Sequence, residues 1–85
     1  MDAPRTFTLA GFPRIAANPA ICGGRAVIAG TRMRVVDVLE MLAAGATTDE
    51  IVQDFPYVTS EDIRAALAYA ASTVGHPIVT ADAAE

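Results

Sequence analysis

Arginine is the residue type with the clearest chemical potential in this 85-residue chain, which has no lysine. Five of its six arginines lie in residues 1–34 beside one acid, Asp2, so that part carries a net charge of +4. Residues 35–85 hold Arg64 and nine acids, and carry −8. Guanidinium groups bind phosphates and carboxylates through paired hydrogen bonds. We therefore expect the first part to bind nucleic acid or an acidic protein site, and the second to repel phosphate.

Three of these arginines fall in a predicted β-hairpin. Residues 25–29 and 32–35 form its strands, and Gly30-Thr31 forms a two-residue type II′ turn, in which glycine takes the first position. This register pairs Ala29 with Arg32 and Val27 with Arg34. The exposed face of the hairpin then carries these residues: Arg25, Arg32, Arg34, Val27 and Ala29. The opposite face supplies the core with Ile28, Met33 and Val35.

Catalysis is not expected. Cys22 and His76 could form a nucleophile and a base, but the sequence offers no third group to orient them. A zinc site needs three or four ligands at suitable spacing, and the chain has one cysteine and one histidine. The glycines near Cys22 and at Gly30 match no phosphate-binding motif, and turns explain them better. We expect no catalytic residue, cofactor or metal, and hence no enzyme.

Three short helices follow the hairpin in the predicted fold. The first has apolar residues at helical spacing from Val35 to Leu42 and ends near Gly45. The second spans residues 47–55, where Thr47 and Glu50 form a capping box, and the third spans residues 59–72 with Thr59 as its cap. Weak strand signals precede the hairpin at residues 5–9 and 14–16. The predicted fold is mainly α with a small N-terminal β part, a β-hairpin followed by a three-helix, helix-turn-helix bundle.

The last two helices have the size of a DNA-binding helix-turn-helix. On the exposed face of the third, only Arg64 could read a guanine, while Glu61 and Asp62 oppose phosphates. The arginine face of the hairpin is the better candidate, because two-stranded ribbons can enter the major groove. An equally good alternative is that these arginines form salt bridges with acidic helices or an acidic partner.

Size and composition predict one domain over residues 1–72. We expect residues 73–85 to form a tail that either binds a partner or is disordered. No apolar run reaches the roughly 20 residues that cross a bilayer, and the N-terminus lacks the features of a signal peptide. The single cysteine favours a reducing compartment, so we expect a cytoplasmic protein without a membrane partner. A small core and a free hairpin edge also favour a homodimer.

Residues 18–35, NPAICGGRAVIAGTRMRV, resemble the start of the DUF433 family. The likeness covers roughly residues 14–71 and includes Phe55-Pro56 and the later sequence Thr59 to Ile63, TSEDI. Ala26 stands where the family usually has proline, and Phe55 where it usually has tyrosine. The residues that match the first motif are Gly24, Arg25, Gly30, Thr31 and Arg32.

The resemblance implies a homeodomain-like helical core behind a β segment. It also implies an antitoxin of a bacterial type II toxin–antitoxin pair, whose partner resembles a PIN-type ribonuclease. We expect the antitoxin also to bind operator DNA. PIN-like active sites are clusters of acids around a divalent metal, which an arginine surface or the tail could block. Two alternatives remain: a stand-alone dimeric DNA-binding regulator, and a dimeric adaptor that binds no DNA.

Overall fold

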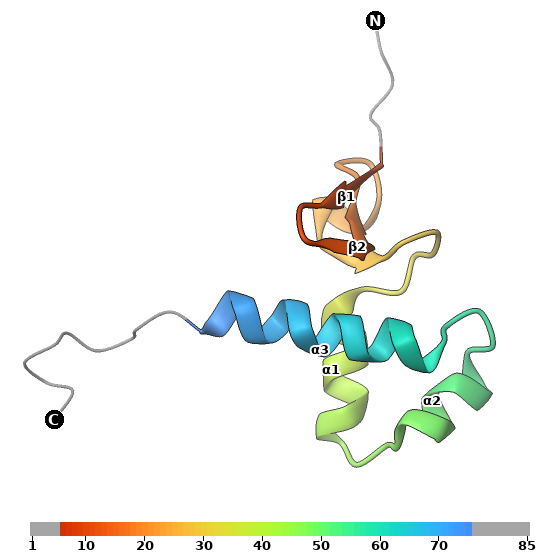
Figure 1. Ribbon diagram of the computed structural model, residues 1–85. Coiled ribbons are helices and arrows are strands. Elements are labelled where there is room, and N and C mark those ends of the chain that lie inside the picture. Colours follow the sequence, from red (N-terminus) through yellow and green to blue (C-terminus); the bar gives the residue numbers. More distant parts are fainter. Residues whose placement is uncertain (1–5, 76–85) are drawn as a thin grey trace, which may run out of the picture.

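Three strands precede three α-helices in the computed structural model, which describes residues 6–75 (Figure 1). This arrangement confirms the predicted fold. The strands and helices, with a 3-10 helix η1 between β2 and β3, are β1 (Phe7–Leu9), β2 (Phe12–Ala17), η1 (Cys22–Gly24), β3 (Val27–Ile28), α1 (Val35–Ala43), α2 (Thr48–Asp54) and α3 (Ser60–Val74).

The sheet is antiparallel, with β2 in the centre. Leu9 pairs with Phe12 across a tight turn in which Gly11 has a φ of +83°, a value that glycine adopts without strain. On its other side β2 pairs with β3, where Ile15 lies opposite Ile28. The predicted strand that resumes near residue 14 is therefore the middle strand of the sheet.

The turn after β3 differs from the predicted type II′ turn. The backbone N–H of Thr31 donates to the carbonyl of Ile28 at 3.0 Å, so the four turn residues are 28–31. Gly30, at φ +81°, takes the third position, where a type II turn requires a positive φ. The hydroxyl of Thr31 also donates to the Ile28 carbonyl at 2.8 Å and accepts the N–H of Met33 at 2.9 Å.

The register after this turn is only partly as predicted. Val27 pairs with Arg34, which is confirmed. Ala29 does not pair with Arg32, because its N–H donates to the carbonyl of Arg14 in β2 at 2.8 Å. Residues 29–33 therefore form a turn and loop instead of a second strand.

Helix α3 packs against β2, α1 and α2, and lies between the sheet and α2 (Figure 1). The core where these elements meet contains six large side chains that are less than 2% exposed: Ile15, Ile28, Val38, Ile51, Val58 and Ile63. Each of the sheet, the helices and the turn before α3 contributes to it. The sheet is thereby fixed relative to the helices.

Both predicted helix caps are confirmed. At α2, the hydroxyl of Thr47 accepts the N–H of Glu50 at 3.1 Å, and the Glu50 carboxylate accepts the N–H of Thr47 at 2.8 Å. Thr59 caps α3 in the same way. Helix α3 runs to Val74, two residues beyond the predicted end, and residues 76–85 of the predicted tail lie outside the described residues. Within residues 6–75 no helix combines the length and the apolar character needed to span a membrane.

Candidate functional site

Arg34, predicted as an exposed member of the arginine face, is held by its own helix. It is the N-cap residue of α1, and its Nε and Nη2 atoms donate to the two Asp37 carboxylate oxygens at 3.1 and 2.7 Å. The same carboxylate accepts the backbone N–H of Arg34 at 3.2 Å. Hydrogen bonding to Asp37 raises the pKa of Arg34, and hydrogen bonding to Arg34 lowers the pKa of Asp37. Arg34 therefore stabilises the N-terminus of α1.

Substitution of Asp37 by asparagine tests this pair through its pH dependence. The stability that ionised Asp37 provides is fully present above the ordinary carboxyl pKa of 3.8 and is lost as the pH falls through the lowered pKa of the folded state. At pH 7 we expect Asp37→Asn to lower the Tm by about 2–5 °C. The difference from the wild type should shrink as the pH falls below 3.8, in thermal unfolding followed by circular dichroism. Asp54 is an exposed carboxylate at the end of α2, and Asp54→Asn is the matched control. It should change the Tm little at neutral and at acidic pH.

Arg25 and Arg32 remain available for binding. Both are exposed, and within residues 6–75 neither side chain forms an ion pair or hydrogen bond. Both are attached to the η1 turn: the N–H of Arg25 donates to the Cys22 carbonyl at 3.2 Å, and the Cys22 thiol donates to the Arg32 carbonyl at 3.6 Å. The two loops that carry these accessible guanidinium groups are thus both hydrogen-bonded to Cys22. We call Arg25 and Arg32 the arginine pair.

The predicted exposed face between these arginines does not exist as such. Val27, expected to lie on it, is 3% exposed. Asn18 and Ile21, in the loop after β2, line a hollow together with Val27 and Arg32. The prediction was wrong because it treated the hairpin as a separate ribbon, whereas Val27 pairs with Ala16 of β2 and lies beside that loop.

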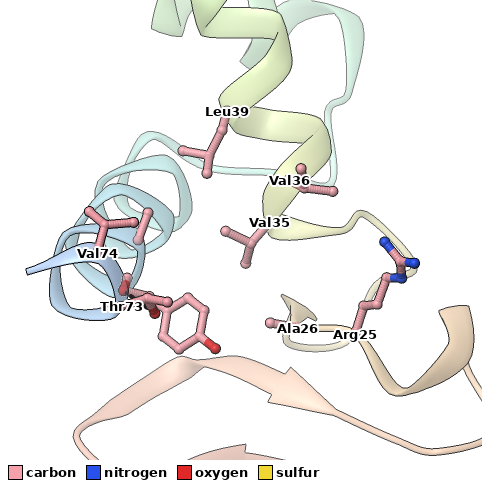
Figure 2. A pocket seen from close by; sticks show the side chains of 9 residues that line it. Arg25, Ala26, Val35, Val36, Leu39, Thr73 and Val74 are labelled. Atoms are coloured by element: carbon pink, nitrogen blue, oxygen red, sulfur yellow. Dashed lines mark hydrogen bonds between the residues drawn. The ribbon is translucent and has the colours of Figure 1, made fainter. Parts of the chain in front are cut away.

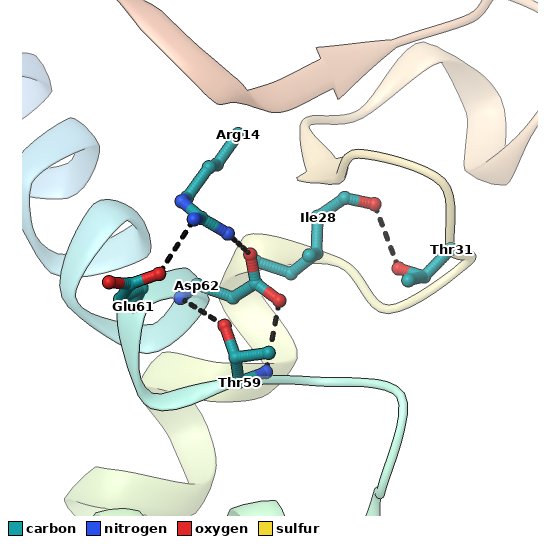
Figure 3. Close-up of polar contacts among 6 residues, drawn as sticks. All are labelled: Arg14, Ile28, Thr31, Thr59, Glu61 and Asp62. Carbon is teal, nitrogen blue, oxygen red and sulfur yellow. Dashed lines mark hydrogen bonds and ion pairs between the residues drawn. The ribbon is translucent and has the colours of Figure 1, made fainter.

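Arg14, which the sequence did not single out, links the sheet to the start of α3 (Figure 3). Its guanidinium donates to Glu61 at 2.7 Å and to Asp62 at 3.0 Å. Asp62 is 7% exposed and also accepts the N–H of Thr59 at 3.0 Å. A salt bridge to an acidic helix residue, considered for the hairpin arginines, is made by Arg34 with Asp37, and Arg14 makes further ones with Glu61 and Asp62. No local pattern connects residues 14 and 62, so only the fold reveals this contact.

Arg64 is the other candidate binding residue, and it lies on the exposed side of α3. Its side chain has no ion pair or hydrogen bond to any described residue. Helices α2 and α3 follow each other across the break at residues 55–59, as expected for a helix-turn-helix. Arg14 compensates part of the negative charge of Glu61 and Asp62 at the start of α3.

An apolar groove borders Arg25 (Figure 2). It has a volume of about 250 Å³ and lies between α1, the C-terminal half of α3 and Ala26. Val36 and Leu39 line it from α1, and Ala70 and Val74 line it from α3. Nothing in the sequence periodicity indicated this groove, because its residues come from three separate segments.

Cys22 and His76 are the residues that could have formed a nucleophile and a base. Cys22 is half-buried, and His76 lies outside the described residues. The Cys22 thiol is engaged with the Arg32 carbonyl. In the described part of the chain, no group of three or more His, Cys, Asp or Glu residues is placed to hold a metal ion.

The fold and the surface together define a small domain in which a three-stranded sheet and its loops are joined to a helix-turn-helix-like bundle. The chain belongs to the family described as "Protein of unknown function (DUF433)", whose model matches residues 15–70. The predicted family membership is confirmed.

Three bacterial proteins are among those similar to this chain. A crystal structure of a DUF433 member protein from Anabaena variabilis is 32% identical with a TM-score of 0.67, over 73% of this chain and 60% of that one. The crystal structure of Rv2018 from Mycobacterium tuberculosis is 38% identical with a TM-score of 0.55, over 62% of this chain and 24% of that one. The uncharacterized protein y4eO of Sinorhizobium fredii is 38% identical over 56 residues, which are 66% of this chain. This chain spans only 25% of the length of y4eO.

Proposed function

We propose that the chain is the antitoxin of a bacterial type II toxin–antitoxin pair and neutralises a PIN-like ribonuclease in the cytoplasm. The observation that carries the proposal is the arginine pair. Arg14 and Arg34 are bound to acids of their own chain, whereas the side chains of Arg25 and Arg32 are exposed and form no ion pair or hydrogen bond with a described residue. Both also belong to the sequence motif of the DUF433 resemblance.

The chemistry of the proposed target fits this pair. A PIN-like active site is a cluster of carboxylates around a divalent metal, and guanidinium groups bind carboxylates through two parallel hydrogen bonds. Cations placed among the carboxylates would compete with the metal and cover the site that the RNA must reach. The chain itself would supply binding energy and no catalytic group.

Pull-down with the product of a neighbouring gene that encodes a nuclease tests the proposal. We expect the tagged chain to retain the nuclease and to protect cells in which the nuclease is induced. If cells that produce the wild-type chain are not protected from the induced nuclease, the antitoxin function is rejected. The variant Arg64→Ala, which removes an exposed arginine outside the pair, should still retain the nuclease.

Operator binding is the second proposed activity, and the surroundings of Arg64 favour it. Arg64 is exposed on α3, and Arg14 offsets two acids that would otherwise face phosphates near that helix. A single arginine that reads guanine contributes about a tenfold preference or more. We therefore expect Arg64→Ala to weaken binding to the promoter of its own operon by about tenfold, measured by fluorescence anisotropy at fixed salt.

The outcomes of this experiment separate the alternatives. Affinity for the promoter without any protein partner would favour a stand-alone regulator. No DNA binding, alone or with the partner, would favour an adaptor. Unchanged affinity in Arg64→Ala would contradict the helix as the reading element.

We also propose a homodimer, in which the pairing edge is β1. The pairing edge was predicted on the hairpin, but backbone groups at the β3 edge are already hydrogen-bonded. The N–H of Ile28 donates to the Met33 carbonyl at 2.8 Å, and the Ala26 carbonyl accepts the N–H of Val35 at 2.9 Å. Strand β1 is the other edge of the sheet, and Phe7 on it is 54% exposed. A monomer at high micromolar concentration in light scattering would contradict the dimer.

A further inference from the structure

The apolar groove beside Arg25 is a surface whose shape and charge suit a protein segment. Its floor is fixed, because the ring of Tyr69 packs edge-on against Phe12 with 5.5 Å between the ring centroids. Its rim is left in water: Val36 on α1 is 38% exposed and Val74 on α3 is 66% exposed. Covering these side chains would remove apolar area from water, which is favourable in proportion to the area.

Charge at the groove indicates what covers it. Among the described residues that line the groove, Arg25 is the one that is charged, and none of them is an acid. The Arg25 side chain extends at one edge of the groove, away from its apolar floor (Figure 2). An occupant that matches both properties has apolar side chains on one side and a carboxylate that reaches Arg25.

The flanking elements indicate the form of the occupant. Helices α1 and α3 form the two sides of the groove, and a third helix packs naturally between two helices through its apolar face. We propose that the groove binds an amphipathic helix of the nuclease partner, with its apolar face on Val36 and Val74 and a carboxylate on Arg25. This inference rests on the proposed antitoxin function.

Arg25 makes the groove and the arginine pair one continuous interface. It belongs to the pair and also lines the groove. Helix binding in the groove would therefore place the partner against the loops that carry Arg25 and Arg32. The groove would supply apolar contact area and the arginines would fix orientation.

The double variant Val36→Gln/Val74→Gln tests the groove with the full-length chain and the purified neighbouring nuclease. Glutamine is uncharged and favours helix, so the change removes apolar surface with little effect on α1 or α3. We expect the Kd in calorimetry to rise by about tenfold or more. Leu67→Gln is the matched control, since Leu67 is 46% exposed on α3 outside the groove, and its Kd should stay within about twofold. Circular dichroism and thermal unfolding establish whether each variant is folded. If the double variant does not fold, the single variant Val74→Gln is used in its place.

The outcomes distinguish this inference from the function on which it rests. If Arg25→Ala weakens binding and the folded groove variants do not, the groove inference is wrong and the antitoxin function stands. If the wild-type chain does not bind the nuclease, both fall. If the groove variants instead convert a wild-type dimer to monomers in light scattering without the nuclease, the occupant is a second copy, which overturns the proposed helix of the partner.

Discussion

The variant Arg25→Ala/Arg32→Ala is expected to bind the nuclease at least about 100-fold more weakly than the wild type. Only the backbone of each residue is hydrogen-bonded to the η1 turn. Both guanidinium groups are exposed, and neither contributes an ion pair within the described chain. Their removal should therefore reduce affinity while leaving the melting temperature nearly unchanged. The measurement is calorimetric titration of the nuclease with each variant.

Two controls identify the cause of this loss. The variant Arg25→Lys/Arg32→Lys keeps both charges but not the paired hydrogen bonds, so it should fall between the wild type and the alanine variant. Arg64→Ala removes one exposed arginine from α3 and should leave the affinity for the nuclease unchanged. Equal affinity of the alanine variant and the wild type would show that the nuclease does not bind the arginine pair.

Asp62→Ala is expected to have the largest effect on stability among the polar substitutions, about 2–3 kcal/mol. Its carboxylate lies between Arg14 of the sheet and the N–H of Thr59 at the start of α3. The residue is only 7% exposed, so water cannot replace these contacts fully. Alanine would remove half of the capping box and would also cut the link between β2 and α3.

Glu61→Ala is the matched control for this prediction. Glu61 binds the same Arg14 guanidinium at 2.7 Å, but its side chain is 68% exposed. An exposed ion pair contributes at most about 1 kcal/mol. Urea unfolding of both variants gives the comparison, and a loss for Asp62→Ala no larger than that for Glu61→Ala would contradict the role assigned to burial.

The helical part could be predicted because its signals are local. The caps at Thr47 and Thr59 are each completed by a residue three positions later, Glu50 and Asp62. Such a pair needs no other part of the chain. The pairing of Arg34 with Asp37 has the same spacing and could have been predicted from the sequence, which instead placed Arg34 on the exposed face of the hairpin.

The sheet and the binding surface depend on distant contacts, which explains the errors there. Ala29 could pair with Arg32 or with β2, and the Arg14 carbonyl takes its N–H. That choice shifts the turn by one residue and moves Gly30 from the first central position to the second. Val27 is buried in a sheet with β2, beside a loop whose path no local pattern specifies. The arginine pair survives because Arg25 and Arg32 lie in loops on either side of β3.

Inhibition of the nuclease is the measurement that tests the central claim most directly. Increasing amounts of the chain are added to the purified product of the neighbouring nuclease gene, and cleavage of a fluorescent RNA is followed with its divalent metal present. The wild-type chain should abolish cleavage near equimolar amounts, and Arg25→Ala/Arg32→Ala should fail to do so at the same ratio. Cleavage that continues unchanged with excess wild-type chain would contradict the account.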